Sequence, residues 1–457
     1  MVFVLLALAI STPVAAADVG RGDIRKAAKL AAKKPFDASE RLWPMLESAE
    51  GARADEVRFH LARSLLALDM PAAAEPYLTA IVKEGPEAGD FEPAAKLLVE
   101  IAEHFHDIES LEPLALALPR ESLPPVVEPY FLYLQGVHAA ETGDLATARR
   151  LLDDVLPPVR PYAKFYQGVV FAKQGKMQSA YGAFLDVHQA SGDGRVDAPP
   201  DLRDAAIMNV ARIYFDVERW DEAKKYYRMI GKRSPYWAEA LLESGWTYFM
   251  TDQLEPALSR VLTVKATPGV WLPEATVLEC LVYYSANAFQ EAENELFRFG
   301  TDGSSLHYEM EELLRTAKDR PEIAWDTTFA EGDGSDLPPV LRAVAARDRR
   351  YQAVRERIAQ IATERLAVKV APPTWKATVG VAIDAQLAHD EEALRRSGGE
   401  RVLELTTRAL AKLDDLMTQA ELIRFEIGEA RRKEYEERAT SPAPDRKPAE
   451  QKKKPGP

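Results

Sequence analysis

The sequence has few of the residues that build disulfides, metal sites and nucleic-acid surfaces. Among 457 residues there are one cysteine, Cys280, and seven histidines. A single thiol cannot form a disulfide within the chain, so we expect packing alone to stabilise the fold and Cys280 to be a small buried residue. Asp and Glu (72) outnumber Lys and Arg (58), giving a net charge of −14. This balance argues against nucleic-acid binding, because neutralising phosphates requires a basic surface.

Long apolar runs are equally scarce, and the one that stands out begins the sequence: MVFVLLALAISTPVAAADVG. An apolar stretch of about ten residues that ends in small residues is typical of a signal peptide, whereas a membrane-spanning helix needs ~20. We therefore expect residues 1–17 to be removed on export and no transmembrane segment to remain. No Lys or Arg precedes the run, and a buried first helix is the alternative.

Catalytic and metal-binding motifs are also missing from the sequence. It contains no HExxH, GxSxG, Walker or dinucleotide-binding pattern. His104 and His106 are two residues apart, so on a helix they point to different faces. The acidic glycine loops at 191–197 and 331–339 lack the ligand spacing of an EF-hand. We expect no metal, no cofactor and no enzymatic activity.

What the sequence does contain is a repeat. The segment YLQGVHAAETGDLATARRLLDDV (133–155) matches FYQGVVFAKQGKMQSAYGAFLDV (165–187) with a constant offset of 32 residues. Self-similarity at this period is typical of stacked helix pairs. Gly136 and Gly168 occupy the same position inside the first helix, where glycine costs ~1 kcal/mol relative to alanine. Close approach of the paired helix can offset that cost, so both glycines are predicted to be packing residues.

The next unit, residues 205–235, follows the same frame. Here the sequence resembles the tetratricopeptide repeat, a helix-turn-helix unit of about 34 residues with small residues where its helices cross. The resemblance implies an all-α fold, with a solenoid of helix pairs over residues 18–303. Weaker units follow at 240–264 and 277–299, and 24–50 is expected to be a capping pair. The positions that carry the resemblance are Val210, Ala211, Tyr214, Ala223, Tyr227, Ile230 and Pro235.

In such solenoids the first helix of each pair lines the inner face, and the family's groove positions transfer to this chain unit by unit. They are mostly large and apolar, which predicts a groove for an apolar helix or a proline-rich segment. Two alternatives remain open: tight packing of the superhelix, or occupation of the groove by the chain's own C-terminal helices. The candidate groove residues are Phe59, Arg63, Tyr133, Phe165, Val169, Met208, Arg212, Phe215, Leu242, Trp246, Phe249, Leu281 and Tyr284, with Asp216 among them.

The repeat is lost after about residue 305, and residues 304–438 are predicted to form a helical hairpin or coiled-coil arm. APPTW (371–375) and SGGE (397–400) are expected to separate its helices. The arm could pack on itself or serve as a dimerisation or partner helix. Apolar residues at spacings of three and four define its seams: Tyr351, Val354, Ile358 and Ile361, then Val402, Leu405, Ala409, Leu413, Leu416, Ala420, Ile423 and Ile427.

The last segment, 439–457, is rich in proline and lysine and is predicted to be a disordered basic tail. Taken together, these features favour a non-enzymatic scaffold that binds other envelope proteins in the periplasm. The run QAELIRFEIGEARRKEYEE is similar to periplasmic repeat proteins of the myxobacterial gliding-motility machinery. The alternative is a periplasmic chaperone or carrier that holds apolar polypeptide in the groove.

Overall fold

The computed structural model consists of helices and the turns between them, and the described residues contain no strand. The predicted signal peptide, the acidic glycine loops 191–197 and 331–338, and the tail from residue 441 lie outside the described residues. The structure describes residues 21–189, 198–268, 270, 272–329, 339–345 and 347–440.

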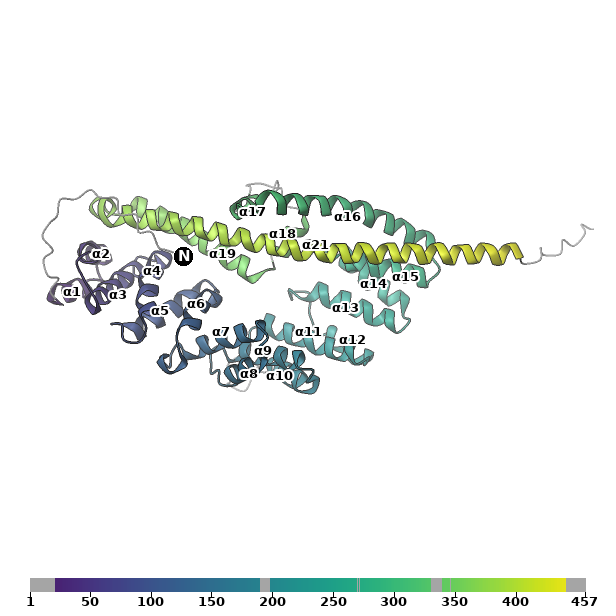
Figure 1. Ribbon diagram of the computed structural model, residues 1–457, viewed down its shortest axis with the longest axis horizontal. Helices are drawn as coiled ribbons and strands as arrows, with labels where there is room; N and C mark the ends of the chain where they lie inside the picture. Colours follow the sequence, from purple (N-terminus) through teal and green to yellow (C-terminus); the bar gives the residue numbers. More distant parts are fainter. Residues whose placement is uncertain are drawn as a thin grey trace, which may run out of the picture.

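The described helices up to residue 317 form eight consecutive pairs, each packed against the next (Figure 1). This arrangement confirms the predicted all-α solenoid. The expected boundary between residues 303 and 304 falls inside α16, which continues through it. The pairs are α1 (Arg21–Ala28) and α2 (Pro35–Leu42), α3 (Ala52–Leu66) and α4 (Pro71–Glu84), α5 (Phe91–His104) and α6 (Glu112–Ala117), α7 (Glu128–Glu141) and α8 (Leu145–Asp153), α9 (Arg160–Lys173) and α10 (Met177–Gln189), α11 (Pro200–Asp216) and α12 (Trp220–Tyr227), α13 (Trp237–Met250) and α14 (Leu254–Lys265), and α15 (Glu274–Ser285) and α16 (Phe289–Ala317).

The glycines inside the first helices mark the closest approach within a pair. A Cβ placed on Gly168 would lie 2.6 Å from the ring of Phe184, and one on Gly136 would lie 2.8 Å from Leu152. Real Cβ atoms essentially never show such short contacts, so a larger residue would require Phe184 or Leu152, or the helix that carries it, to shift. The prediction that these glycines are packing residues is confirmed.

The turns within the pairs also repeat. From the pair α3–α4 onward, one residue between the two helices adopts a left-handed backbone conformation. Three or four residues separate the helices of a pair, except in α5–α6, where the connection includes a short 3-10 helix. Two of these residues are glycines, which adopt this conformation without strain, and most of the others are Asp or Asn. The left-handed residues are Asp69, His106, Gly143, Gly175, Glu218, Asp252 and Asn287.

The chain then reverses and runs back along the solenoid. Figure 1 shows α21 as a straight rod from the N-terminal pairs to α15 and α16, with α19 beside its first part. At 60 residues, α21 is about 90 Å long. A single π-helical turn, Lys376–Gly380, precedes it. The other helices of this part are α17 (Pro321–Phe329), α18 (Pro339–Ala345), α19 (Arg349–Val370), the short α20 (Pro373–Trp375) and α21 (Val381–Thr440).

The predicted seams are largely buried, and every seam residue from Val402 to Ile427 is less than 9% exposed. Their partners extend beyond the predicted arm. The first half of the second seam packs with Met310, Trp325 and Leu341 from α16, α17 and α18, whereas the second half packs with α15 and α16. The arm and the last repeat therefore share one core.

The prediction that SGGE separates two helices is wrong, because α21 passes through Gly398 and Gly399 without a break. A Cβ on Gly399 would lie 1.8 Å from the carbonyl oxygen of Pro321, and one on Gly398 would lie 2.3 Å from the Trp325 ring. The two glycines let α17 cross α21 at backbone contact. Like Gly168, they allow two helices to cross closely. They interrupt the apolar pattern of the sequence, but the helix continues through them.

Helices α19 and α21 form a hairpin that runs back along the solenoid, and it contacts both ends of the solenoid. At the N-terminal end, Trp375 is fully buried, its ring packs edge-on against Phe36 at 5.3 Å, and its Nε1 donates to Ser39 Oγ at 2.7 Å. At the other end, Ile427 is buried beside Leu296. Within the described residues, no helix is long and apolar enough to cross a membrane.

We expect Gly399→Ala to lower the free energy of unfolding by about 3 kcal/mol, because the new methyl group would overlap backbone atoms of α17. Gly428→Ala is the matched control in the same helix: its Cβ meets nothing within 4 Å, so the replacement should stabilise by about 0.5–1 kcal/mol. Urea unfolding of both variants measures the difference. Equal effects of the two substitutions would contradict the close crossing.

Candidate protein-binding surface

The structure places the candidate groove residues on the first helices of the pairs, at three levels of exposure. Four of them are buried and act as core residues between helices: Phe59, Tyr133, Met208 and Leu242. Seven are half-buried: Phe165, Val169, Phe215, Trp246, Phe249, Leu281 and Tyr284. The polar ones, Arg63, Arg212 and Asp216, are exposed.

The half-buried aromatic residues of α9, α11 and α13 contact rings of their own pair. Phe165 packs edge-on against Phe184 with ring centres 5.4 Å apart, and Phe215 packs on Trp220 at 5.0 Å. Trp246 and Phe249, on one helix, are 6.0 Å apart and perpendicular. Each ring is thus held by its neighbours while part of its surface stays accessible, as expected for a preformed apolar binding surface.

The two candidate arginines already have partners within the solenoid. Arg212 forms a bidentate pair with Glu243 of α13, with Nε–Oε2 and Nη2–Oε1 distances of 3.0 and 2.7 Å, and Tyr227 donates to the same carboxylate. Arg63 lies over the ring of Phe59, 5.8 Å from its centre. Arg212 therefore joins two successive pairs and fixes the spacing of the aromatic residues beside it.

The candidate residues of the last pair lie against α21. Leu281 and Tyr284 pack on the cluster that contains Leu416 and Ala420. From the same first helix, Glu274 forms an ion pair with Lys412 of α21. At this end the chain's own C-terminal helix therefore covers the inner face, which was one of the two alternatives to an open groove.

The start of α19 contacts the third and fifth pairs of the solenoid. Arg349 lies over the ring of Tyr162 at 5.6 Å and 3.9 Å from Glu109. Tyr133 is buried beside Tyr162 and Tyr166. Between this contact and α15, helices α11 and α13 pack mainly against their solenoid neighbours. Their half-buried aromatic groove candidates are Phe215, Trp246 and Phe249, and we call these three residues the central inner face.

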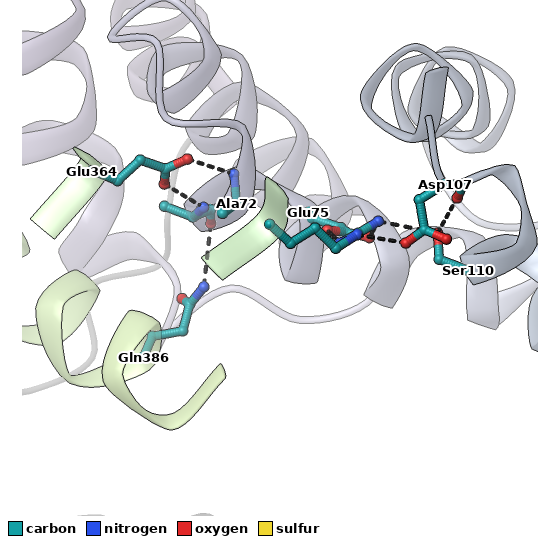
Figure 2. A network of polar contacts seen from close by, with 8 residues as sticks. Ala72, Glu75, Asp107, Ser110, Glu364 and Gln386 are labelled. Atoms are coloured by element: carbon teal, nitrogen blue, oxygen red, sulfur yellow. Dashed lines mark hydrogen bonds and ion pairs between the residues drawn. The ribbon is translucent and has the colours of Figure 1, made fainter. Parts of the chain in front are cut away.

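A polar network joins α19 and α21 to the N-terminal part of the solenoid (Figure 2). Helix α4 begins after Met70 without a side-chain cap of its own. Glu364 of α19 supplies the cap, accepting from the backbone N–H groups of Ala72 and Ala73 at 2.8 and 2.9 Å. From α21, Gln386 donates to the carbonyl oxygen of Ala73. A carboxylate suits this position because the first N–H groups of a helix lack partners and carry partial positive charge.

Arg357 lies beside this cap and joins three segments. It pairs with Glu75 of α4 at 2.6 Å and with Asp107 after α5 at 2.7 Å, and it donates to Ser110 Oγ at 3.0 Å. Figure 2 shows these groups in one line with the Glu364 cap. Burial raises the pKa of Asp107, and the arginine opposes that shift by stabilising the carboxylate. The charge pair is largely removed from solvent and every member has a partner.

Sequence reasoning proposed candidate groove residues, which stay a prediction, but it missed this network. One signal was present: the start of α4, DMPAAAE, has no Ser, Thr, Asp or Asn directly before its first proline. When a helix begins without a capping residue, its first N–H groups need a hydrogen-bond acceptor from elsewhere. A second signal was Arg357, a charge within an apolar seam. Neither signal identifies the partner residue.

The geometry defines an α-solenoid whose pairs are of the tetratricopeptide type. Small residues, including Gly168, Ala211, Gly245 and Ala223, stand where its helices cross. The chain thus has a tetratricopeptide-repeat fold, as the sequence resemblance implied. No protein-family model matches the sequence, and neither does any curated protein.

The solved structures that this chain resembles share little sequence identity with it. One is a tetratricopeptide repeat protein from Parabacteroides merdae (15% identity, 61% of this chain and 98% of that chain, TM-score 0.31). Another is the APC/C hetero-tetramer Cut9–Hcn1 (10%, 88% and 96%, TM-score 0.21). A third is the human IFIT1 dimer with m7Gppp-AAAA (10%, 85% and 89%, TM-score 0.29). The repeat assignment for this chain rests on its own helix packing.

The Glu364 cap predicts a pH dependence of stability. Burial raises the pKa of Glu364 from 4.5 to about 7, against the opposing effect of its backbone hydrogen bonds. The folded chain therefore binds this proton more tightly than the unfolded chain. Its contribution to stability is complete below pH 4.5 and is lost as the pH rises through 7, by up to about 3 kcal/mol.

Glu364→Gln keeps an acceptor at the start of α4 and removes the titration. We expect the free energy of unfolding to fall between pH 5 and pH 8 by less in Glu364→Gln than in the unmodified chain. The exposed Glu87→Gln is the control for removal of one carboxylate. Identical pH dependence in all three proteins would contradict the role of Glu364.

Proposed function

We propose that this protein is a non-enzymatic scaffold of a bacterial envelope assembly, and that it binds a protein partner on the central inner face. The observation that carries the proposal is the arrangement of Phe215, Trp246 and Phe249. These three aromatic residues are half-buried, held by neighbouring rings, and lie between two solenoid ends that the chain's own hairpin joins.

Such a surface suits an apolar helix or an extended proline-rich segment. Large aromatic residues supply most of the binding energy where they enter or line a desolvated pocket. Arg212, Glu243 and Tyr227 hold successive pairs at one spacing. A surface fixed in advance loses less conformational freedom on binding, which favours a specific and lasting complex.

The buried ionisable groups support a non-enzymatic reading, because their partners are structural. Glu364 caps a helix, and Asp107 pairs with Arg357. Burial raises the pKa of Cys280 to about 12, so at neutral pH this thiol is protonated and a poor nucleophile. Among the described residues, no group of three or more His, Cys, Asp and Glu side chains could hold a metal ion.

The envelope location rests on the first residues of the sequence. The apolar run that ends in Ala15–Ala17 favours export, and the similarity of residues 419–437 to periplasmic motility proteins favours a place in a larger assembly. The apolar seams of the arm are buried against other parts of the same chain. Any contact of the arm with that assembly would therefore use its exposed surfaces.

We expect the double variant Phe215→Ala, Trp246→Ala to bind the partner at least tenfold more weakly, because truncating an aromatic anchor costs about 2 kcal/mol. The partner is first captured by mild crosslinking in the protein's own cell envelope, and its affinity is then measured with purified components. Met177→Ala is the control, since it removes an exposed apolar side chain from the second helix of a pair.

The same capture separates the scaffold from the chaperone. One stoichiometric partner whose binding depends on Trp246 supports the scaffold. A broad set of unfolded outer-membrane polypeptides, each bound weakly, would contradict it and favour the chaperone. Full binding by the double variant would show that the central inner face is not the binding site.

A further inference from the structure

The outer face of the α16–α21 pair carries exposed apolar side chains that no other part of the described chain covers well. On α16, Phe297 is 71% exposed and Tyr308 is 69% exposed. On α21, Leu422 and Phe425 are 62% and 65% exposed. We call these four residues the outer aromatic face. Side chains of this size rarely remain so accessible together unless something covers them.

Ion pairs set the relative position of the two helices. Arg431 pairs with Glu293 at 2.9 Å, and His307 Nε2 lies 3.0 Å from Asp414, so α16 and α21 run antiparallel. This register places Phe297 and Phe425 at nearly the same level along the pair. Close to that level, a Cβ on Gly428 would meet nothing within 4 Å, so there is open space beside the aromatic residues.

Acidic residues outnumber basic ones in the same part of the molecule. Residues 290–312 of α16 contain seven Asp and Glu and one Arg, and residues 413–430 of α21 contain five Asp and Glu and one Arg. Their combined charge is −10, compared with −14 for the whole chain. Glu311, three residues after Tyr308, and Glu421, four residues before Phe425, are among the exposed carboxylates of this face. The face therefore combines accessible aromatic rings with an excess of carboxylates.

We propose that the C-terminal segment of the same chain, residues 441–457, binds to the outer aromatic face. This segment follows α21 directly and lies outside the described residues. Its 17 residues include five prolines and five Lys and Arg, with two Asp and Glu. Proline-rich segments dock on aromatic surfaces, and the basic side chains complement the carboxylates around the rings.

The segment is long enough to reach this face. Arg431 is level with Glu293, so α21 ends at Thr440 about 14 Å beyond that point, at ~1.5 Å per residue. Tyr308 lies 15 residues past Glu293, about 23 Å along α16 in the opposite direction. The return path is thus about 37 Å, whereas 17 residues in an extended proline-type helix span about 53 Å.

Attachment to the same chain makes a weak contact effective. A short linker raises the local concentration of the segment to the millimolar range, so modest contacts with Phe297 and Phe425 keep it bound much of the time. The charge attraction weakens with added salt, because the carboxylates of this face are solvent-exposed. Docking would cover the outer aromatic face until a competing basic segment displaced the tail.

The test is zero-length crosslinking of lysine to carboxylate with a carbodiimide in the full chain, read by mass spectrometry. We expect Lys452, Lys453 and Lys454 to crosslink to Glu311 and Glu421 within the monomer. About 0.5 M salt should reduce these crosslinks at least fivefold. The double variant Phe297→Ala, Phe425→Ala should reduce them by a similar factor while leaving every reacting group in place.

Leu366→Ala is the matched control, because it removes an apolar side chain of similar exposure from the other end of the hairpin. It should leave the crosslinks unchanged. Crosslinks found only in a dimer band would overturn the proposal in favour of a second copy as the occupant. Crosslinks to other surfaces, or crosslinks insensitive to the Phe297 and Phe425 changes, would overturn it as well.

Discussion

The structure depends on the contact that joins both ends of the solenoid to one returning hairpin. A stack of helix pairs contacts only its neighbours, so its ends are free and its curvature follows from small rotations between pairs. Here Trp375 is buried against the first pairs, and Ile427 is buried against the last. Because α21 is one continuous helix, it sets the distance between the two ends. The hairpin therefore holds the two ends of the solenoid at a set separation.

Apolar burial supplies most of the stabilisation at this contact, whereas the polar groups select one register. Ile361 and Val368 of α19 would tolerate small displacements against other apolar side chains. Glu364 would not, because a shift of one residue would leave its buried carboxylate without the two N–H groups of α4. The hairpin therefore holds the central inner face in one shape. The proposed role of that face as a binding surface relies on this shape.

Close helix crossings recur throughout the molecule, and glycine makes them possible in both halves. The interpretation of Gly168 was right because the repeat gave it a context: an equivalent glycine stands 32 residues earlier in the same helix. Gly398 and Gly399 have no repeated context, and two adjacent glycines after a charged run resemble a loop. Only the position of α17, whose Pro321 carbonyl occupies the space of a Cβ, explains them.

The sequence by itself determined the helix pairs, the small residues at their crossings and the apolar seams of α21, because periodic patterns within one helix depend on local geometry. It also placed the aromatic residues on the first helices. The tertiary structure decided what those surfaces meet. The cap that Glu364 gives to Ala73 joins residues 291 positions apart, and the pairing of Arg212 with Glu243 joins two repeats. Such contacts have no local period, since they depend on how far the whole stack curves before the chain returns.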